Sequence, residues 1–305
     1  MGNVIFAGRD GRPSMKGAYA NMVTNADLVV RRRLPHKEYY RVYKGHNSNS
    51  YLKVRIGDYD FTNSVIIRWG NRIEIDTTNS IVYNQSKAIA DATDKKKARL
   101  ILHEAGVRVP KMVTLENVKE ADLPIICRPF THAKGKNFII LNTIQEFKNH
   151  YNPNRYYYSA FVNKVKEYRI HCAHGKILNF LEKPNPKNGS IAWNRARNGG
   201  EAFENVKWDD YNFNCGIEAL KACKALKLDF SGIDVLLDEK GVAWVLEANT
   251  SPTLASSEYS MQRYGMYFDW LFRKNEKREH WDFTKFEKAG SLAWKNYQLK
   301  DEQQK

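Results

Sequence analysis

The first 83 residues carry their apolar side chains in short runs, which predict β-strands. Residues 4–7 and 26–30 form two such runs, and residues 64–69 form a third with the composition of a strand covered on both faces. Residues 39–59 mix tyrosines with lysines and arginines, which predicts an amphipathic strand pair whose cations reach the solvent. The alternative is a surface on which bases or acidic chains stack and pair.

After residue 86 the apolar period becomes helical. Residues 87–105 predict one amphipathic helix, closed by Gly106 and Pro110. A second helix is predicted at residues 211–226, with one apolar face that packs in the core. The residues of that face are Phe213, Ile217, Leu220, Cys223 and Leu226. Between the two helices we expect apolar strands at 123–129, 156–162 and 177–181.

Two other segments are interpreted from their length and charge. Residues 184–201 make a loop too long for a plain connection, and such loops in compact domains tend to be functional. Residues 259–271 predict a helix, and residues 273–305 are highly charged and predict a docked helical appendage with a frayed end.

The most informative alternation of apolar and polar residues lies at residues 229–254 and predicts a β-hairpin. Its turn is the sequence Asp-Glu-Lys-Gly at 238–241, where the glycine is free to take a positive φ. Asp234 lies on the first arm, and Glu247 and Asn249 lie on the second. Because residues i and i+2 of a strand share a face, Glu247 and Asn249 point the same way, with Asp234 roughly opposite them.

Two carboxylates and an amide that converge in this way repel one another unless a cation lies between them. Proteins usually bind Mg²⁺ through a few oxygen ligands of their own, while water and phosphate supply the others. The bland alternative is a solvated hairpin face. It leaves unexplained why the second arm ends in Asn-Thr-Ser-Pro.

Length, cysteine content and charge limit the classes of protein to which the chain can belong. A chain of 305 residues can bury a sizeable core and divide into two or three domains. Its four cysteines show no CxxC pairing, which favours reduced structural thiols in a cytoplasmic protein over a disulfide framework or a zinc site. No apolar run is long enough to span a membrane, and the N-terminus lacks the order of a signal peptide. The net charge of +15 indicates attraction to an anionic partner.

Asp234, then Glu247-Ala248-Asn249 and Ser251-Pro252, together resemble the metal signature of the ATP-grasp superfamily of carboxylate–amine ligases. The motif is similar to that of D-alanine–D-alanine ligases and of the glutamate ligases that modify a ribosomal protein. The resemblance implies an α/β (α+β) protein with ATP held between two antiparallel sheets. It also implies that these three residues hold Mg²⁺, with Mn²⁺ as an alternative ion, against the ATP phosphates.

The resemblance also divides the chain. It implies an α/β N-terminal, substrate-side domain and a two-part ATP-grasp unit, followed by the charged appendage. The expected ranges are 1–83 for the N-terminal domain, 84–162 and 163–272 for the two ATP-grasp subdomains, and 273–305 for the appendage.

Several cations are candidates for binding phosphate. Arg128 ends an apolar strand, and Gly135 and Lys136 lie in the glycine-containing loop after it, an arrangement that suits a polyphosphate. By resemblance, Lys95 belongs to the Asp-Lys pair at the entry of the ATP-grasp unit, which also includes Asn84. The family usually has lysine where this chain has Arg128, so the charge is kept but the point ammonium is replaced by a planar fork.

Residues 159–162 resemble the hinge that pairs with adenine through its backbone, so Ala160, Phe161 and Val162 are nucleotide candidates. The family usually has glutamate at position 160, and its absence leaves the adenine contacts to the main chain. Glu167 and Arg169 resemble the acidic-x-Arg motif of the family, which places Glu167 in the nucleotide site and Arg169 toward phosphate or substrate.

D-alanine ligases carry an arginine two residues before the first metal aspartate, where it supports the oxyanion. This chain has Gly232 there. Either Lys183, a strand-end cation, or Arg195 in the long loop takes that role, or the chemistry differs from that of the family. The resemblance also implies that Lys183 holds the phosphates together with Arg128 and Lys136. His171 and His174 are expected to be residues of the strand surface, since no cysteine or histidine partner lies at zinc spacing.

The activity implied by the resemblance is ligation of a carboxylate to an amine through an acyl phosphate, with release of ADP and phosphate. The substrate would be an amino acid or a peptide, and the net charge leaves room for an anionic macromolecular acceptor, either nucleic acid or acidic peptide. Two other classes stay open: a phosphotransferase on the same fold, and a nucleic-acid-binding protein with a degenerate ATP site.

Overall fold

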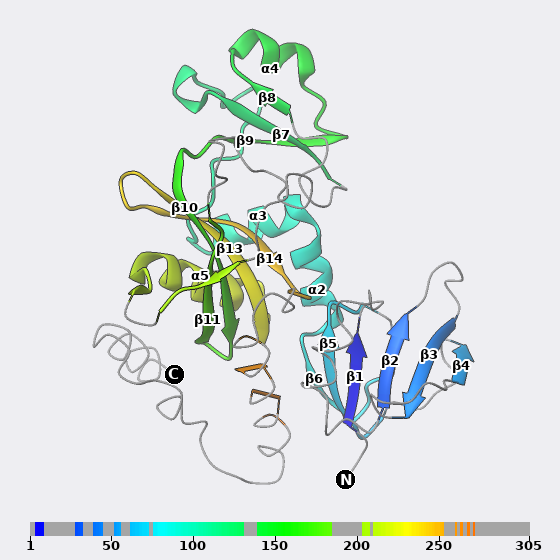
Figure 1. Cartoon of the computed structure of the whole chain (residues 1–305). Helices are drawn as coiled ribbons and strands as arrows, with labels where there is room; N and C mark the ends of the chain where they lie inside the picture. The colour runs from blue at the N-terminus through cyan, green and yellow to red at the C-terminus, as the bar shows by residue number, and fades with distance from the viewer. Residues whose placement is uncertain are drawn as a thin grey trace.

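The computed structural model arranges the described strands of the chain in three sheets (Figure 1). For the four strands at 4–8, 28–32, 39–44 and 52–55 only the backbone is described. The other residues described are 62–72, 76–130, 139–184, 203–207, 210–252, 260, 263, 264, 267, 268 and 271. The predicted loop residues 131–137, most of the 184–201 loop and the appendage at 273–305 lie outside this set.

The N-terminal sheet has six described strands in the order β4-β3-β2-β1-β5-β6. β1 lies between β2 and β5 and is parallel to both, β6 continues the parallel part, and β3 and β4 extend the sheet in antiparallel fashion. The predicted strands and the predicted strand pair within 39–59 are thus confirmed. Their bounds are β1 Val4–Gly8, β2 Leu28–Arg32, β3 Tyr39–Lys44, β4 Leu52–Arg55, β5 Val65–Trp69 and β6 Ile81–Tyr83.

The second sheet is small and antiparallel. β7 (Ile125–Pro129) lies between β8 (Ile139–Leu141) and β9 (Tyr156–Ala160), preceded by the short helix η2 (Glu120–Asp122). Helix α4 (Ile144–His150) packs on this sheet through Phe147, which is fully buried against Tyr151 and Tyr158.

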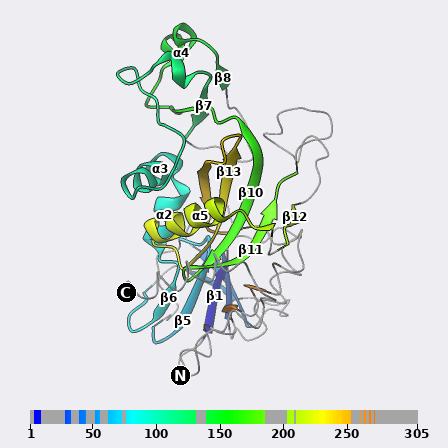
Figure 2. The same ribbon diagram turned by 90° about the vertical axis from the view of Figure 1, so that its left-hand side faces the viewer.

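The third sheet is antiparallel, in the order β12-β11-β10-β13-β14. Its strands are β10 (Lys164–Ala173), β11 (Lys176–Glu182), β12 (Glu204–Asn205), β13 (Phe230–Asp238) and β14 (Ala243–Asn249). Helix α5 (Phe213–Ala225) covers one face of it, as Figure 2 shows, and forms with it the largest core. The predicted helix is confirmed, but its first apolar residue, Phe213, is exposed rather than packed in this core.

The segment predicted as one helix at 87–105 is two helices, so that prediction was wrong. α2 (Ser86–Thr93) and α3 (Lys95–Glu104) meet at Asp94, whose backbone is extended (φ −76°, ψ 104°). The carboxylate of Asp94 accepts a hydrogen bond from the N–H of Lys97 at 3.0 Å and so caps α3. The break turns the start of α3, and with it Lys95, toward the third sheet. Gly106 closes α3 with φ +71°, as predicted.

The other face of the third sheet is partly covered by an aromatic cluster of Trp69, Phe230, Tyr264, Tyr267 and Phe268. The last three belong to a segment whose described residues are helical, within the predicted helix at 259–271. Trp69 ends β5 of the N-terminal sheet and stacks on Phe230 of β13 at 5.5 Å between ring centroids. The cluster therefore joins the N-terminal sheet to the third sheet.

A second junction between these sheets is made by Asn84, which is fully buried with φ +59°. Its backbone N–H donates to the carboxylate of Asp229 at 2.5 Å, and its side-chain amide donates to the carbonyl of Phe230 at 2.9 Å. Its amide oxygen accepts in turn from the N–H of Asp229 at 2.8 Å. Asn84 thus binds the start of β13 directly after β6.

All four cysteines are free and buried, which agrees with structural thiols. Burial raises the pKa of Cys127 to about 11 and the pKa values of Cys215 and Cys223 to about 12. In the part of the chain that the structure describes, no helix is both long and apolar enough to cross a membrane.

Candidate functional site

The hairpin of β13 and β14 forms as predicted, with Gly241 at φ +73° in the turn. Asp238 stabilises this turn because its carboxylate accepts hydrogen bonds from the N–H groups of Lys240 (2.9 Å) and Val242 (2.8 Å) and from the indole of Trp244 (2.8 Å). The tight turn fixes which residues of the two arms lie opposite one another.

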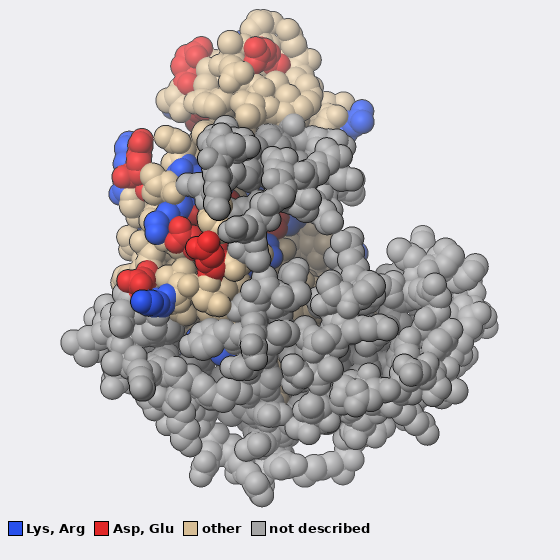
Figure 3. Space-filling view, viewed as in Figure 1, with Lys and Arg blue, Asp and Glu red and all other residues tan. Residues whose placement is uncertain are grey.

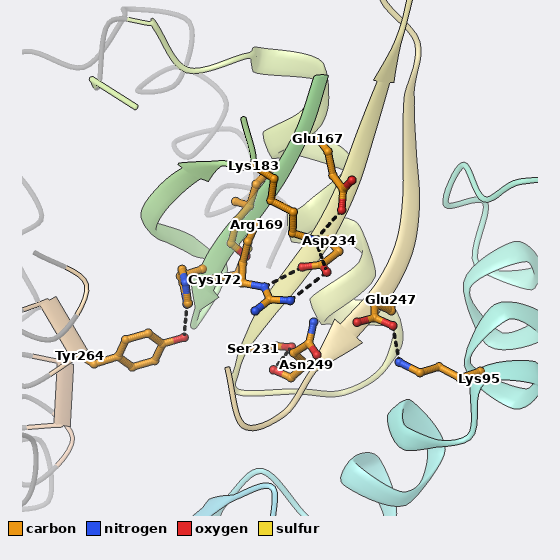
Figure 4. A network of polar contacts seen from close by, with 12 residues as sticks. Lys95, Glu167, Arg169, Cys172, Lys183, Ser231, Asp234, Glu247, Asn249 and Tyr264 are labelled. Carbon is orange, nitrogen blue, oxygen red and sulfur yellow. Dashed lines mark hydrogen bonds and ion pairs between the residues drawn. The ribbon is translucent and has the colours of Figure 1, made fainter. Parts of the chain in front are cut away.

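In the resulting register, Asp234 pairs directly with Glu247, and Gly232 pairs with Asn249. The three predicted oxygen donors therefore share one face, the face opposite α5. Figure 4 shows their side chains on this side of the sheet.

Asp234 is held by two cations of the protein. Arg169 of β10 lies opposite it in the strand register and makes a two-pronged contact, Nε to Oδ1 at 2.7 Å and Nη2 to Oδ2 at 2.9 Å. Lys183, just beyond β11, donates to Oδ2 at 2.6 Å. With 4% of its surface exposed, Asp234 depends on these partners for its charge.

Glu167 extends the same network. Lys183 donates to its Oε1 at 2.5 Å, and Lys164 forms an ion pair with its Oε2. Three strands thus bring Glu167, Arg169, Lys183 and Asp234 into one alternating chain of charges (Figure 4).

Glu247 faces a different element. The ammonium of Lys95, the first residue of α3, lies 2.5 Å from its Oε2. The expectation that a cation must separate the carboxylates is met here by side chains of the protein: Arg169 and Lys183 at Asp234, and Lys95 at Glu247.

The cations hold the carboxylates ionised. Burial alone would raise the pKa of Asp234, but Arg169 and Lys183 outweigh it and the pKa lies well below its usual value. The pKa of Glu167 is lowered in the same way by Lys183 and Lys164 against the effect of burial. The pKa of Glu247 is lowered by Lys95, against burial and against the neighbouring charge of Asp234.

These lowered pKa values predict a loss of stability in acid. A carboxylate whose pKa is depressed by folding stabilises the native state above its unfolded pKa, near 4, and that contribution is lost as the pH falls toward the folded value. We expect the free energy of unfolding to decline below about pH 5. The Glu167→Gln variant should show a shallower decline between pH 6 and 4 in urea titrations.

Glu104→Gln is the matched control, since Glu104 is exposed at the end of α3. Parallel curves for the parent and Glu167→Gln would contradict the assignment of a depressed pKa to Glu167.

The oxygen donors of Asp234, Glu247 and Asn249 decide whether a metal ion can be held here. In the described residues no group of three or more His, Cys, Asp or Glu side chains is arranged to hold a metal, so any ion here must rely on two carboxylates, an amide and non-protein ligands. The amide nitrogen of Asn249 is buried and has no hydrogen-bond partner in the described part of the chain. Rotating this amide by 180° puts its oxygen at the same place. The set therefore fits Mg²⁺.

The other predicted residues lie on or after the strands of the second sheet, or outside the described residues. Arg128 lies on β7 opposite Tyr157 of β9. The N–H groups of Ala160 and Phe161 donate to the carbonyls of Lys111 and Pro124, both at 2.9 Å. Of the predicted hinge, the Val162 N–H is thus the donor without an acceptor among the described residues. Gly135, Lys136 and Arg195 lie outside the described residues.

The prediction that His171 lies on the strand surface was wrong. Its side chain is fully buried, with Nδ1 3.1 Å from the hydroxyl of Tyr264, because the aromatic cluster covers this end of the sheet. Burial, together with the nearby Arg169, lowers its pKa to about 3. His174 contacts the same segment, with Nδ1 2.7 Å from the hydroxyl of Tyr267.

Sequence reasoning also missed Arg99, which is buried within α3. Three lysines at 95–97 precede it in the same helix, and their charge predicts a solvent-exposed helix face. The local sequence therefore gives no signal that Arg99 is buried.

The surroundings of Gly232 leave no room for the arginine that D-alanine ligases carry two residues before the first metal aspartate. A Cβ atom there would lie 2.8 Å from Cβ of Pro252, too close for a side chain, and 3.5 Å from Cδ of Arg169. Arg169, on the neighbouring strand, thus brings a guanidinium next to the place from which the arginine of the resembled ligases would extend.

No protein-family model matches the chain, and no curated protein matches it. Solved structures do match. The VanG D-Ala:D-Ser ligase from Enterococcus faecalis superposes with a TM-score of 0.61 at 14% identity, over 89% of this chain and 99% of that chain. The ATP-grasp ligase PsnB complexed with minimal precursor, Mg and ADP gives a TM-score of 0.59 at 13% identity, over 90% and 99% of the two chains.

A D-alanine–D-alanine ligase from Bacillus anthracis, complexed with ATP, gives a TM-score of 0.54 at 14% identity, over 90% of this chain and 99% of that chain. At such identities the likeness concerns the fold. The chain has the ATP-grasp fold, with mixed helices and sheets and two antiparallel sheets, as the residues around Asp234 and Glu247 had indicated.

Proposed function

We propose that this protein is an ATP-dependent ligase that joins a carboxylate to an amine through an acyl phosphate. The observation that carries the proposal is the shared face of Asp234, Glu247 and Asn249, surrounded by Arg169, Lys183 and Lys95. The fold supports it, because the similar structures are named as ligases and include complexes with ATP and with Mg and ADP.

In the proposed reaction a carboxylate oxygen of one substrate attacks the γ-phosphorus of ATP, and the bond to the β–γ bridging oxygen breaks to release ADP. The amine nitrogen of the second substrate then attacks the acyl carbon. Phosphate leaves with the electrons of the acyl–oxygen bond, and the amine gives up its proton to solvent. No protein nucleophile is required, and the buried thiols with raised pKa values are unsuited to that role.

Asp234, Glu247 and Asn249 would hold Mg²⁺. When bound, the ion would offset the charge of the phosphates and fix their orientation. Lys95 of α3 and Arg128 of β7 would hold the phosphates together with Lys136. Val162 would offer its backbone N–H to adenine, with the carbonyls of Ala160 and Phe161 as acceptors. Gly135 and Arg195, which lie outside the described residues, would serve the phosphates and the substrate.

Arg169 and Lys183 would stabilise negative charge on the reacting carboxylate. Arg169 is a better candidate than Lys183 for the oxyanion role, because the side chain of Arg169 passes beside Gly232. Preorganised cations in a water-poor site stabilise developing charge without reorganising at the moment of reaction. Glu167, bonded to Lys183, would keep that lysine in place.

We propose a peptide as one of the two substrates. PsnB, one of the similar structures, was also solved in complex with the precursor peptide PsnA2 and AMPPNP. The net charge of +15 favours an acidic peptide over a neutral one.

The described part of the face in Figure 3 does not display Lys and Arg as one patch. On the face in Figure 3, the coloured Lys and Arg side chains are interspersed with Asp and Glu. An extended basic surface for nucleic acid is therefore not what the described part of this face offers.

The test is phosphate release from Mg-ATP by the purified chain, with panels of amino acids and acidic peptides and mass spectrometry of the products. We expect ADP and phosphate only when an acid and an amine are both present, with a product mass equal to their condensation. Turnover without any amine, with phosphate retained on the product, would mean a phosphotransferase. Tight nucleic-acid binding that is steeply salt-dependent and indifferent to Mg-ATP would overturn the proposal.

A further inference from the structure

Arg99 of α3 is a buried cation without a carboxylate partner. It is 3% exposed, and no ion pair to it is found in the described residues. Its guanidinium instead donates from Nη1 to the carbonyl of Pro110 and from Nη2 to the carbonyl of Leu246, both at 3.2 Å. Burying a charge without a counter-ion costs free energy, so its presence in this helix needs a physical reason.

The two carbonyls belong to segments on either side of the candidate site. Leu246 directly precedes Glu247 on β14. Pro110 directly precedes Lys111, whose carbonyl accepts the N–H at the end of β9 at 2.9 Å. One guanidinium thus joins α3, β14 and the segment that leads to the second sheet.

Arg99 also shares a helix side with Lys95, since residues four apart on a helix are neighbours. Lys95 contacts the carboxylate of Glu247, while Arg99 contacts the backbone one residue before it. Both ends of the Glu247 residue, its carboxylate and its backbone, are therefore positioned from α3.

The shape of the Arg99 side chain matters as well as its charge. Burial is the largest influence on its pKa and lowers it to about 10. Tyr157 and Glu247 raise the pKa, and Arg128 lowers it. Arg99 therefore remains a cation at neutral pH. A planar fork can donate to two separate carbonyls at once, whereas a lysine ammonium is a compact point charge on a flexible stem.

We propose that Arg99 is a positioning residue that sets Glu247 relative to Lys95 and thereby determines how strongly Mg²⁺ strengthens nucleotide binding. The inference rests on the proposed function. Arg99 would not touch the nucleotide, since its two Nη groups meet backbone carbonyls and its side chain is buried. Its loss should therefore act on the metal-dependent part of binding.

The experiment is isothermal titration of ADP into the full chain with and without Mg²⁺. In the Arg99→Lys variant we expect the ratio of the Kd without Mg²⁺ to the Kd with Mg²⁺ to fall about 10-fold, the lower end of the cost of losing a group that orients a metal ligand. The Kd without Mg²⁺ should stay within about two-fold of the parent, because Arg99 contacts backbone only. Lys97→Gln, whose side chain in the parent is 52% exposed on the same helix, should keep the parent ratio.

Arg99→Gln is the second variant, because it removes the buried charge and so folds without a lone cation in the core. An unchanged ratio in the folded Arg99 variants would overturn the proposal, as would an equal loss of affinity with and without Mg²⁺, which would indicate general packing. If the parent chain itself fails to bind ADP with Mg²⁺, the proposed function is what fails.

Discussion

The Glu247→Gln variant is expected to lose ATP turnover by at least about 100-fold, the upper end of what losing a mere orienting group costs a metal site. Glutamine keeps the size of the side chain but removes the charge that would bind Mg²⁺. The fold should survive, because the Glu247 side chain is 26% exposed and the glutamine oxygen can still accept a hydrogen bond from Lys95.

The measurement is a comparison of phosphate release and thermal unfolding for the parent, Glu247→Gln and Glu239→Gln. Glu239 lies exposed in the turn of the same hairpin and serves as the control for removing one negative charge there. Parent-like turnover in Glu247→Gln would remove the metal site from the proposed mechanism.

Asp234→Asn should differ from the Glu247 variant by affecting stability as well as turnover. Asp234 is buried between Arg169 and Lys183, and its neutralisation removes the carboxylate that Arg169 contacts in two places and one of the two that Lys183 contacts. Removing one partner of a buried ion pair costs about 3 to 5 kcal/mol. We expect a loss near the lower end of that range, since asparagine still offers one acceptor oxygen, together with loss of turnover.

Urea unfolding followed by circular dichroism measures the stability loss. The double variant Asp234→Asn/Arg169→Met should be more stable than Asp234→Asn alone, because it removes the guanidinium that has lost this carboxylate. The short distances indicate that Arg169 and Lys183 depend on the charge of Asp234. An Asp234→Asn variant as stable as the parent would contradict this.

The hairpin was predictable from sequence because its information is local. Alternating apolar residues, a four-residue turn with a glycine and three oxygen donors at fixed spacing determine the register, and Asp234 duly pairs with Glu247. The division of the helix at Asp94 was less accessible. An aspartate inside a helical period can be either a surface residue or a cap, and only the tertiary position of Lys95 decides between them.

The remainder of the site depends on contacts between distant segments. Nothing near His171 in the sequence shows that Tyr264 covers it, and nothing near Arg99 shows that a carbonyl of β14 lies within reach. The ion pairs of Asp234 join residues 51 and 65 positions apart. The resemblance of motifs indicated that these residues belong to a site, but the partners of each charge follow from how the sheets pack.

The junction at Asn84 has a consequence for the order of events during synthesis. Asn84 and Asp229 are 145 residues apart, so Asn84 is made long before its partners exist. At about 5 to 20 residues per second, the ribosome needs roughly 7 to 29 s to travel from one to the other. During that interval Asn84, which is buried in the folded protein, lacks the partners that bury it. The residues of β1 to β6 have then already been synthesised. The strands of the N-terminal sheet are thus available to chaperones before the hairpin of β13 and β14 is translated.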